Sequence, residues 1–234
     1  MANKNEQGAH QSVEHLTQSE AFFAKNKKAI LIAIAAIIIL VLGFFAYRTY
    51  ISGPQEEKAS TAISRGQEYF NQEMFDKALN GDGAGYTGFV KLADDYSGTD
   101  AANLANLYAG LCYANLGKWN DAVTYLDKFD PESDQMISPA AIAALGDAYA
   151  NVNQLDKAID AFKKAADMAD SKAADGANNS LSPTFLIKAG VLLESQNKKD
   201  DALAIYQDIK KKYVTSNIVQ SSEIDKYIER ASTK

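Results

Sequence analysis

Closely spaced glycines that could cradle a phosphate lie in the stretch NGDGAGYTGF, residues 80–89. Gly83, Gly85 and Gly88 have the spacing G-x-G-x-x-G, which in dinucleotide-binding folds brings backbone N–H groups against a pyrophosphate. That chemistry needs a buried strand before the glycines and an acidic residue on a later strand. Residues 51–234 contain no Val/Ile-rich segment of that kind. We therefore predict that the glycines allow a wide turn between two helices and that the protein binds no nucleotide.

Side chains suited to acid–base, metal or nucleophilic chemistry are sparse. Both histidines, His10 and His15, precede a long apolar run, so the larger part of the chain has no histidine for a metal or a proton transfer. Cys112 is the single cysteine, which excludes an intrachain disulfide, and it lies within a predicted helix next to Tyr113. We predict that Cys112 is a buried hydrophobic residue, that the protein is not an enzyme, and that it holds no metal or cofactor.

One uncharged segment is long enough to cross a membrane. Residues 29–46, AILIAIAAIIILVLGFFA, would span about 27 Å as a helix, close to the roughly 30 Å hydrocarbon core of a bilayer. Twelve of these 18 residues are Ile, Leu, Val or Phe, which favours insertion by roughly 4–7 kcal/mol. A cleaved signal peptide, the alternative, has a shorter apolar region that ends in small residues. We predict an uncleaved transmembrane helix at residues 29–50.

The charges beside this segment predict its orientation. Lys25, Lys27 and Lys28 precede it, and Arg48 follows it. Because an excess of Lys and Arg stays on the cytoplasmic side, residues 1–28 are expected to be a cytoplasmic tail, and the rest of the chain lies outside.

Beyond the apolar segment the chain becomes acidic. Gly53-Pro54 is expected to end the transmembrane helix, with a linker at residues 51–58. Residues 51–234 carry 19 basic and 27 acidic side chains. An acidic domain of this size argues against nucleic-acid partners and has enough residues to form its own core.

The outer part of the chain contains internal repeats. The clearest begins at Pro139 and places Leu145, Gly146 and Tyr149 in one helix and Ala158 and Phe162 in the next. This resembles the tetratricopeptide repeat (TPR), in which two antiparallel helices pack closely at small residues. The pattern recurs around Gly110, Gly190 and Gly66, which predicts an all-α solenoid of about four repeats. We expect repeats at residues 59–102, 103–138, 139–182 and 183–215, followed by a capping helix and tail at 216–234.

The first repeat is longer than the others. Gly66 and Tyr69 mark its first helix, and we expect its second helix at residues 86–96, with Gly88 and Leu92 at the positions of Ala158 and Phe162. The glycine-rich stretch would then lie in an insertion of about ten residues between the two helices.

The first helix of each repeat should line a concave surface. The register predicts a protein-binding groove formed by nine side chains: Leu104, Leu107, Leu111, Asn115, Asp147, Asn151, Ile187, Val191 and Glu194. These positions lack basic residues, so we expect an apolar groove with an acidic rim that suits a helix or an extended apolar segment. The alternative is that several of these side chains pack against one another or against the cap.

The whole arrangement resembles a known family of membrane proteins. The segment SEAFFAKNKKAI runs into the apolar helix and is similar to the amino-terminal motif of the ancillary subunits of the SecYEG translocon, the YfgM-type proteins. The matching residues are Phe22, Phe23, Ala24, Asn26, Lys28 and Ala29. The blocks GFVKLADDYSGT and NLANLYAGLCYANLGKWNDAVTYL are similar to the version of this family in Bacteroides-type bacteria.

The resemblance implies a single-pass protein of the bacterial inner membrane with a periplasmic TPR domain. It also implies contact with the SecYEG translocon and with a membrane-anchored, parvulin-like chaperone, in the handling of newly exported chains. We therefore predict a non-enzymatic adaptor with protein partners. A scaffold for envelope or cell-division assemblies and a cleaved, secreted TPR protein remain as alternatives.

Overall fold

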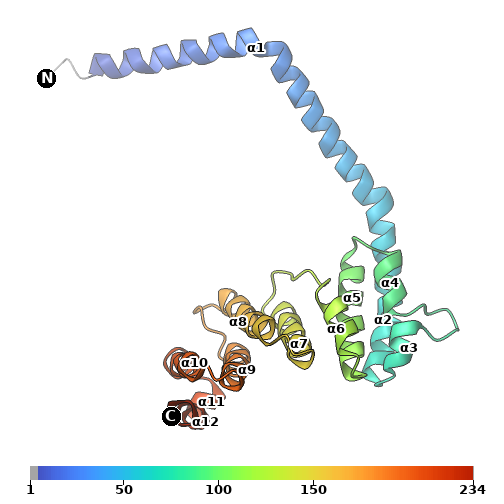
Figure 1. Ribbon diagram of the computed structural model, residues 1–234. Helices are drawn as coiled ribbons and strands as arrows, with labels where there is room; N and C mark the ends of the chain where they lie inside the picture. The colour runs from blue at the N-terminus through green and yellow to red at the C-terminus, as the bar shows by residue number, and fades with distance from the viewer. Residues whose placement is uncertain (1–4, 234) are drawn as a thin grey trace. The chain divides into compact units, whose positions relative to one another are not determined.

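The structure is a computed structural model that describes the backbone of residues 5–233 and the side chains of Phe23 and residues 25–233. The side chains of His10, His15, Phe22 and Ala24 lie outside the described residues, as do the two ends of the chain. All regular secondary structure in the described residues is helical (Figure 1), which confirms the predicted all-α fold. The chain divides into two units, residues 1–55 and 56–234, which we describe separately.

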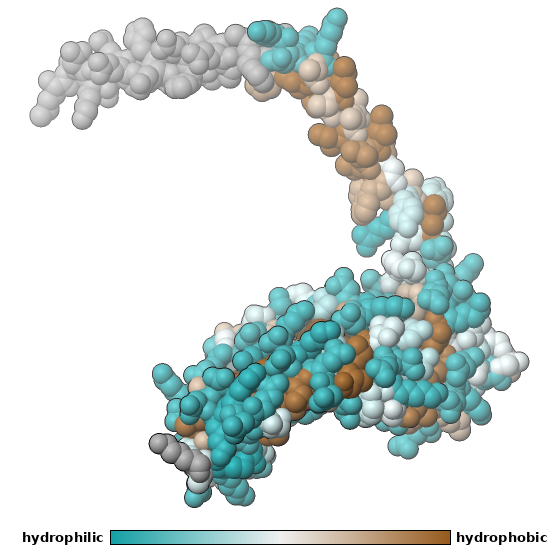
Figure 2. Space-filling model, in the orientation of Figure 1, coloured by the Kyte–Doolittle hydropathy of each residue, from teal (hydrophilic) through white to brown (hydrophobic). Residues whose placement is uncertain are grey.

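The first unit consists of helix α1 (Asn5–Tyr47) and a short π-helix, η1 (Arg48–Ser52). The large apolar side chains between Leu31 and Ile51 are exposed, by 46–80% of their surface. Figure 2 shows this hydrophobic surface along the helix. Among the described residues, the helical segment Lys25–Asn71 contains one stretch long and apolar enough to cross a membrane, and none of that stretch is buried. It is therefore not a core helix of the described fold.

The residues expected to form a linker, 51–58, are helical instead. Helix α2 begins at Gly53 and continues to Asn71. Pro54 directly follows the π-helical segment η1, and the helical segment Lys25–Asn71 runs through it without a break. The N–H of Gly53 donates to the carbonyl of Arg48, five residues back, as in a π-helical turn.

The second unit is a series of antiparallel helix pairs (Figure 1). Helix α2 is followed by α3 (Phe75–Asn80) and α4 (Phe89–Asp95), and then come α5 (Asp100–Asn115), α6 (Trp119–Leu126), α7 (Ile137–Asn151), α8 (Leu155–Ser171), α9 (Ser182–Ser195), α10 (Lys199–Lys212), α11 (Asn217–Gln220) and α12 (Glu223–Ser232). The second helix of each pair also contacts the first helix of the next, and α10 contacts α12 in the same way. The buried side chains of these pairs form three clusters, each made of residues from neighbouring helices.

The turns inside the pairs have one conformation. In each turn, the residue seven positions after the small glycine of the first helix has a positive φ of 58–71°. These residues are Glu73, Gly117, Asn153 and Asn197. The next residue donates its N–H to a carbonyl five residues back, at 2.9 Å in all four turns. This is the Schellman arrangement, which supplies partners for carbonyls at the end of a helix.

Glycine is required where the two helices of a pair cross. A Cβ built at Gly146 would lie 2.9 Å from the ring of Phe162, and one at Gly190 would lie 2.4 Å from that of Tyr206. Gly110 meets Leu126 in the same way. Each large side chain follows its glycine by 16 residues. The small residue of the first helix thus makes room for one large side chain of the second.

The insertion in the first pair lies inside its second helix, and the predicted position between the helices is wrong. Ala78, fully buried on α3, is twelve residues after Gly66, the spacing that Ala158 has from Gly146. Helix α3 therefore starts in the normal register and stops at Asn80. After a loop, Phe89 at the start of α4 lies against Gly66, with a built Cβ only 2.4 Å from its ring. Gly88 and Leu92 do not occupy the predicted positions.

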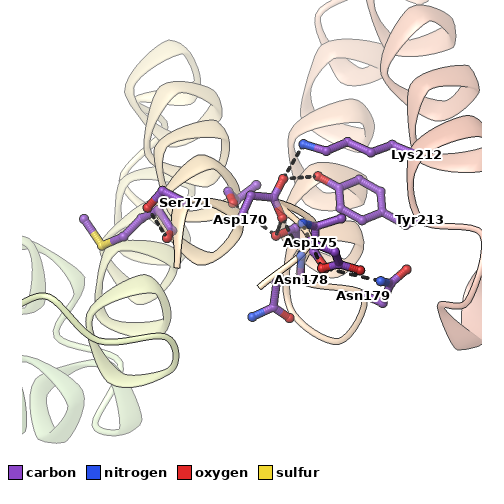
Figure 3. Close-up of polar contacts among 11 residues, drawn as sticks. Asp170, Ser171, Asp175, Asn178, Asn179, Lys212 and Tyr213 are labelled. Carbon is purple, nitrogen blue, oxygen red and sulfur yellow. Dashed lines mark hydrogen bonds and ion pairs between the residues drawn. The ribbon is translucent and has the colours of Figure 1, made fainter. Parts of the chain in front are cut away.

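The third and fourth pairs are joined by a buried carboxylate (Figure 3). Asp170, at the end of α8, is 6% exposed. It accepts hydrogen bonds from Ser182 at 2.6 Å, from Tyr213 at 2.6 Å and from Lys212 at 2.5 Å. Burial opposes ionisation of Asp170, but these hydrogen bonds outweigh it and lower the pKa of the carboxyl below its ordinary value. The carboxylate thus links α8 to both helices of the next pair.

Candidate protein-binding groove

The nine predicted groove residues lie on α5, α7 and α9, the first helices of three successive pairs. Most of their apolar members belong to the core. Leu107 is only 7% exposed and lies in a cluster with Leu126 and Leu145, while the half-buried Leu104 and Leu111 pack against that cluster. Ile187 is half-buried against the core of the last two pairs. Val191, 40% exposed, is the most accessible apolar side chain of the nine. The apolar part of the groove is therefore small.

Both acidic groove residues are paired with basic side chains. Lys188 of α9 reaches Asp147 of α7, with 2.7 Å between Nζ and Oδ2. Arg230 of α12 reaches Glu194 of α9 at 2.7 Å. None of the nine positions is basic, but Lys188 and Arg230, which lie outside them, balance the charges of the expected acidic rim. Lys188 follows the groove residue Ile187 in sequence, but the sequence does not indicate that it reaches Asp147, because the two residues lie on different helices.

The two asparagines, by contrast, are exposed and oriented by their own helices. The side-chain amide of Asn115 donates to the carbonyl of Leu111 at 2.9 Å. Asn151 donates to the carbonyl of Asp147, also at 2.9 Å. An amide has two N–H donors and one carbonyl acceptor, so each asparagine keeps a donor and an acceptor for another molecule.

A cleft borders the groove at the turns of the second and third pairs. It has a volume of about 530 Å³ and is lined by residues 117–121 and 151–153. Asn151 belongs to both the groove and the cleft. Trp119, the single tryptophan of the chain, also lines the cleft.

The backbone of the glycine-rich loop is hydrogen-bonded to the carboxylate of Asp82, a residue of the same loop. Asp82 accepts hydrogen bonds from the backbone N–H of Ala84 at 2.7 Å and of Tyr86 at 3.1 Å. It also accepts one from the hydroxyl of Tyr69 at 2.7 Å and pairs with Arg65. The backbone hydrogen bond from Ala84, followed by that of Tyr69, lowers the pKa of Asp82 to about 2. Two backbone N–H groups of the loop are therefore already used by this side chain.

Cys112 has the environment of a core residue. Its side chain is fully buried in the cluster that joins the first and second pairs. Burial raises the pKa of the thiol to about 12. A thiol in this environment is a weak nucleophile near neutral pH. In the part of the chain that the structure describes, no group of three or more His, Cys, Asp or Glu side chains could hold a metal ion.

Comparison with known protein families identifies the helix pairs. Family models described as tetratricopeptide repeat match residues 139–172, and also residues 104–133 and 185–216. These three segments are tetratricopeptide repeats. They correspond to α7 with α8, α5 with α6, and α9 with α10. No curated protein sequence matches the chain.

Proposed function

We propose that the protein is a non-enzymatic adaptor that is anchored in a membrane and binds protein partners through its TPR domain. The observation that carries this proposal is the combination of stacked TPR helix pairs with one helical stretch able to cross a membrane. TPR domains bind protein partners. Anchoring would hold such a domain at a high effective concentration near a membrane partner, so weak contacts would suffice.

The location that fits this function is the bacterial inner membrane, with one transmembrane helix and the TPR domain in the periplasm. Three lysines precede the apolar segment, and Arg48 follows it. This asymmetry favours a cytoplasmic amino terminus. Protease added to intact spheroplasts should then digest the TPR domain, and digestion only after lysis would reverse the proposed orientation.

The proposed partners are the SecYEG translocon, a membrane-anchored parvulin-like chaperone and newly exported chains. Support comes from the similarity of residues 22–29 and of the first two repeats to YfgM-type translocon subunits. The surface assigned to these contacts is the groove on α5, α7 and α9.

Site-specific photo-crosslinking in living cells tests this assignment. A photoreactive residue at Val191 or Asn115 should crosslink to subunits of the translocon or to the chaperone. The same residue at Gln207, which is exposed on the second helix α10, is the matched control. Crosslinks from the groove only to division or envelope-assembly proteins would overturn the link to export and support the scaffold function.

A further inference from the structure

The cleft of about 530 Å³ lies at the turns of the second and third pairs and is lined by residues 117–121 and 151–153. Its volume is in the range of about 300–1,000 Å³ that is typical of sites for small ligands. Lys118 and Gln154 each donate their backbone N–H to a carbonyl five residues back, at 2.9 Å. Both turns that border the cleft are therefore fixed by their own backbone.

The corresponding place between the third and fourth pairs is bridged by side chains. Asp156 of α8 accepts hydrogen bonds from Gln196 at 2.9 Å and from Lys198 at 3.4 Å, both in the turn of the fourth pair. In the repeat register, Asn120 of the second pair has the position of Asp156. The position of Gln196 is held in the third pair by Val152, whose side chain has no donor or acceptor. The equivalent bridge is therefore missing from the described residues, and the cleft is open.

Trp119 supplies the aromatic surface of this cleft. It is the first residue of α6, and its half-buried side chain packs against the cluster that includes Leu126. The same register position holds Phe75, Leu155 and Lys199 in the other three pairs. The packing of a helix pair therefore does not require a tryptophan there. The faces of an indole ring are apolar and carry negative π-electron density, which attracts weakly positive C–H groups.

Three polar side chains beside the tryptophan are available to a ligand. Asn120, Asp121 and Asn153 are exposed, and within the part of the chain that the structure describes their side chains have no hydrogen-bond partner. Each carboxamide offers donors and an acceptor, and the carboxylate accepts. Lys118 also lines the cleft and carries the charge opposite to that of Asp121. The lining is therefore rich in hydrogen-bonding groups but has no net charge.

We propose that this cleft binds an uncharged carbohydrate, with a pyranose ring stacked on Trp119 and its hydroxyl groups hydrogen-bonded to Asn120, Asp121 and Asn153. The faces of a pyranose ring present C–H groups that suit an indole, while the hydroxyls around its edge both donate and accept. An apolar ligand would leave the polar side chains without partners. A charged ligand would gain no net attraction from a neutral lining. The inference goes beyond the adaptor function and does not depend on it.

The single tryptophan allows binding to be measured directly, because a sugar stacked on Trp119 should change its fluorescence. The full chain would be titrated in a detergent without a sugar headgroup, since a glucoside or maltoside would compete. The probes are cellotetraose, which is made of glucose, and chitotetraose, which has the same linkage but is made of N-acetylglucosamine. Sorbitol is the control ligand, because it has hydroxyl groups but no ring.

The variants take residues from equivalent positions of the same chain, so that the turns are kept. Trp119→Leu introduces the residue that the third pair has as Leu155, and should weaken binding measured by calorimetry about tenfold. Asn153→Gly introduces the residue that the second pair has as Gly117, and should weaken binding by about three- to tenfold. Asn197→Gly makes the same change in the turn of the fourth pair, outside the cleft, and should leave binding unchanged.

Saturable binding of either tetrasaccharide, weakened in both cleft variants, would support the proposal, and the tighter probe would show whether acetamido groups are recognised. Binding of neither probe, equal binding of sorbitol, or unchanged binding by Trp119→Leu and Asn153→Gly would overturn it. Circular dichroism would check that the variants are folded. None of these results bears on the adaptor function, which crosslinking from Val191 tests separately.

Discussion

The first and third helix pairs achieve the same packing by different routes. In the third pair, α8 is continuous for 17 residues, and Phe162 follows Gly146 by 16 residues. In the first pair the second helix stops at Asn80, and Phe89 fills the same place 23 residues after Gly66. The seven additional residues fall in the loop 81–88, where Asp82 binds the backbone N–H groups of Ala84 and Tyr86 and the side chains of Tyr69 and Arg65 on α2. A repeat can therefore accept an insertion inside a helix if a polar anchor replaces the lost helical hydrogen bonds.

The aromatic residues give the strongest test of this equivalence. Phe162→Ala and Phe89→Ala should each destabilise their pair by about 3–5 kcal/mol, because both remove a fully buried ring. Hydrogen exchange measured separately for each pair is the appropriate measurement, since solenoids do not always unfold as one unit. A small effect of Phe89→Ala beside a large effect of Phe162→Ala would show that the two positions are not equivalent.

The glycines of the loop should differ sharply in their tolerance of a side chain. A Cβ at Gly88 would lie 2.1 Å from the carbonyl oxygen of Leu79, and its φ is +92°. Gly88→Ala should therefore displace α4 and remove exchange protection from the first pair. At Gly83, with φ +70°, a Cβ would meet nothing within 4 Å, so Gly83→Ala should cost only about 1–2 kcal/mol of left-handed strain. Equal effects of both variants would argue against close packing of the loop.

The buried carboxylate of Asp170 allows the same comparison for the contact between the third and fourth pairs. Asp170→Asn should loosen α9 and α10 from α8 by about 1–3 kcal/mol, because an amide cannot accept all the hydrogen bonds that the carboxylate receives. The control is Asp167→Asn, which changes an exposed residue of the same helix and should have little effect. Faster exchange in α9 and α10, with α5 and α6 unchanged, is the expected result for Asp170→Asn.

The smallest expected effect is that of pH on the loop. The folded pKa of Asp82 is lowered from 3.8 to about 2, so its contribution is complete above pH 3.8 and is lost as the pH falls towards 2. Exchange protection of residues 81–88 should decline over that window and should be absent at all pH values in Asp82→Asn. Thiol labelling of Cys112, whose cluster includes Phe89, would report whether the change spreads into the core. Loss of loop protection at pH 5 would contradict the role given to this carboxylate.

Several features follow directly from the order of residues. The apolar run at 29–46, the small residues at Gly110, Gly146 and Gly190, and the buried Cys112 were all predicted from the sequence. The repeat register also predicted which helices carry the groove residues. The interruption of α3 was placed wrongly because Ala78 and Phe89 are separated by an insertion. A fixed repeat length therefore selected Gly88 and Leu92 in their place.

The sequence by itself determined the helical periodicity, the repeated small and large residues, and the segment able to cross a membrane. Each of these is a pattern of residue types at a fixed spacing within a short stretch of the chain. Only the tertiary structure decided that Asp147 meets Lys188, that Glu194 meets Arg230, and that Asp82 and Asp170 are held by residues from other segments. The physical reason is that a charge is neutralised by whichever group lies within a few ångströms in space, and chain order does not specify that group when the partners lie on different helices.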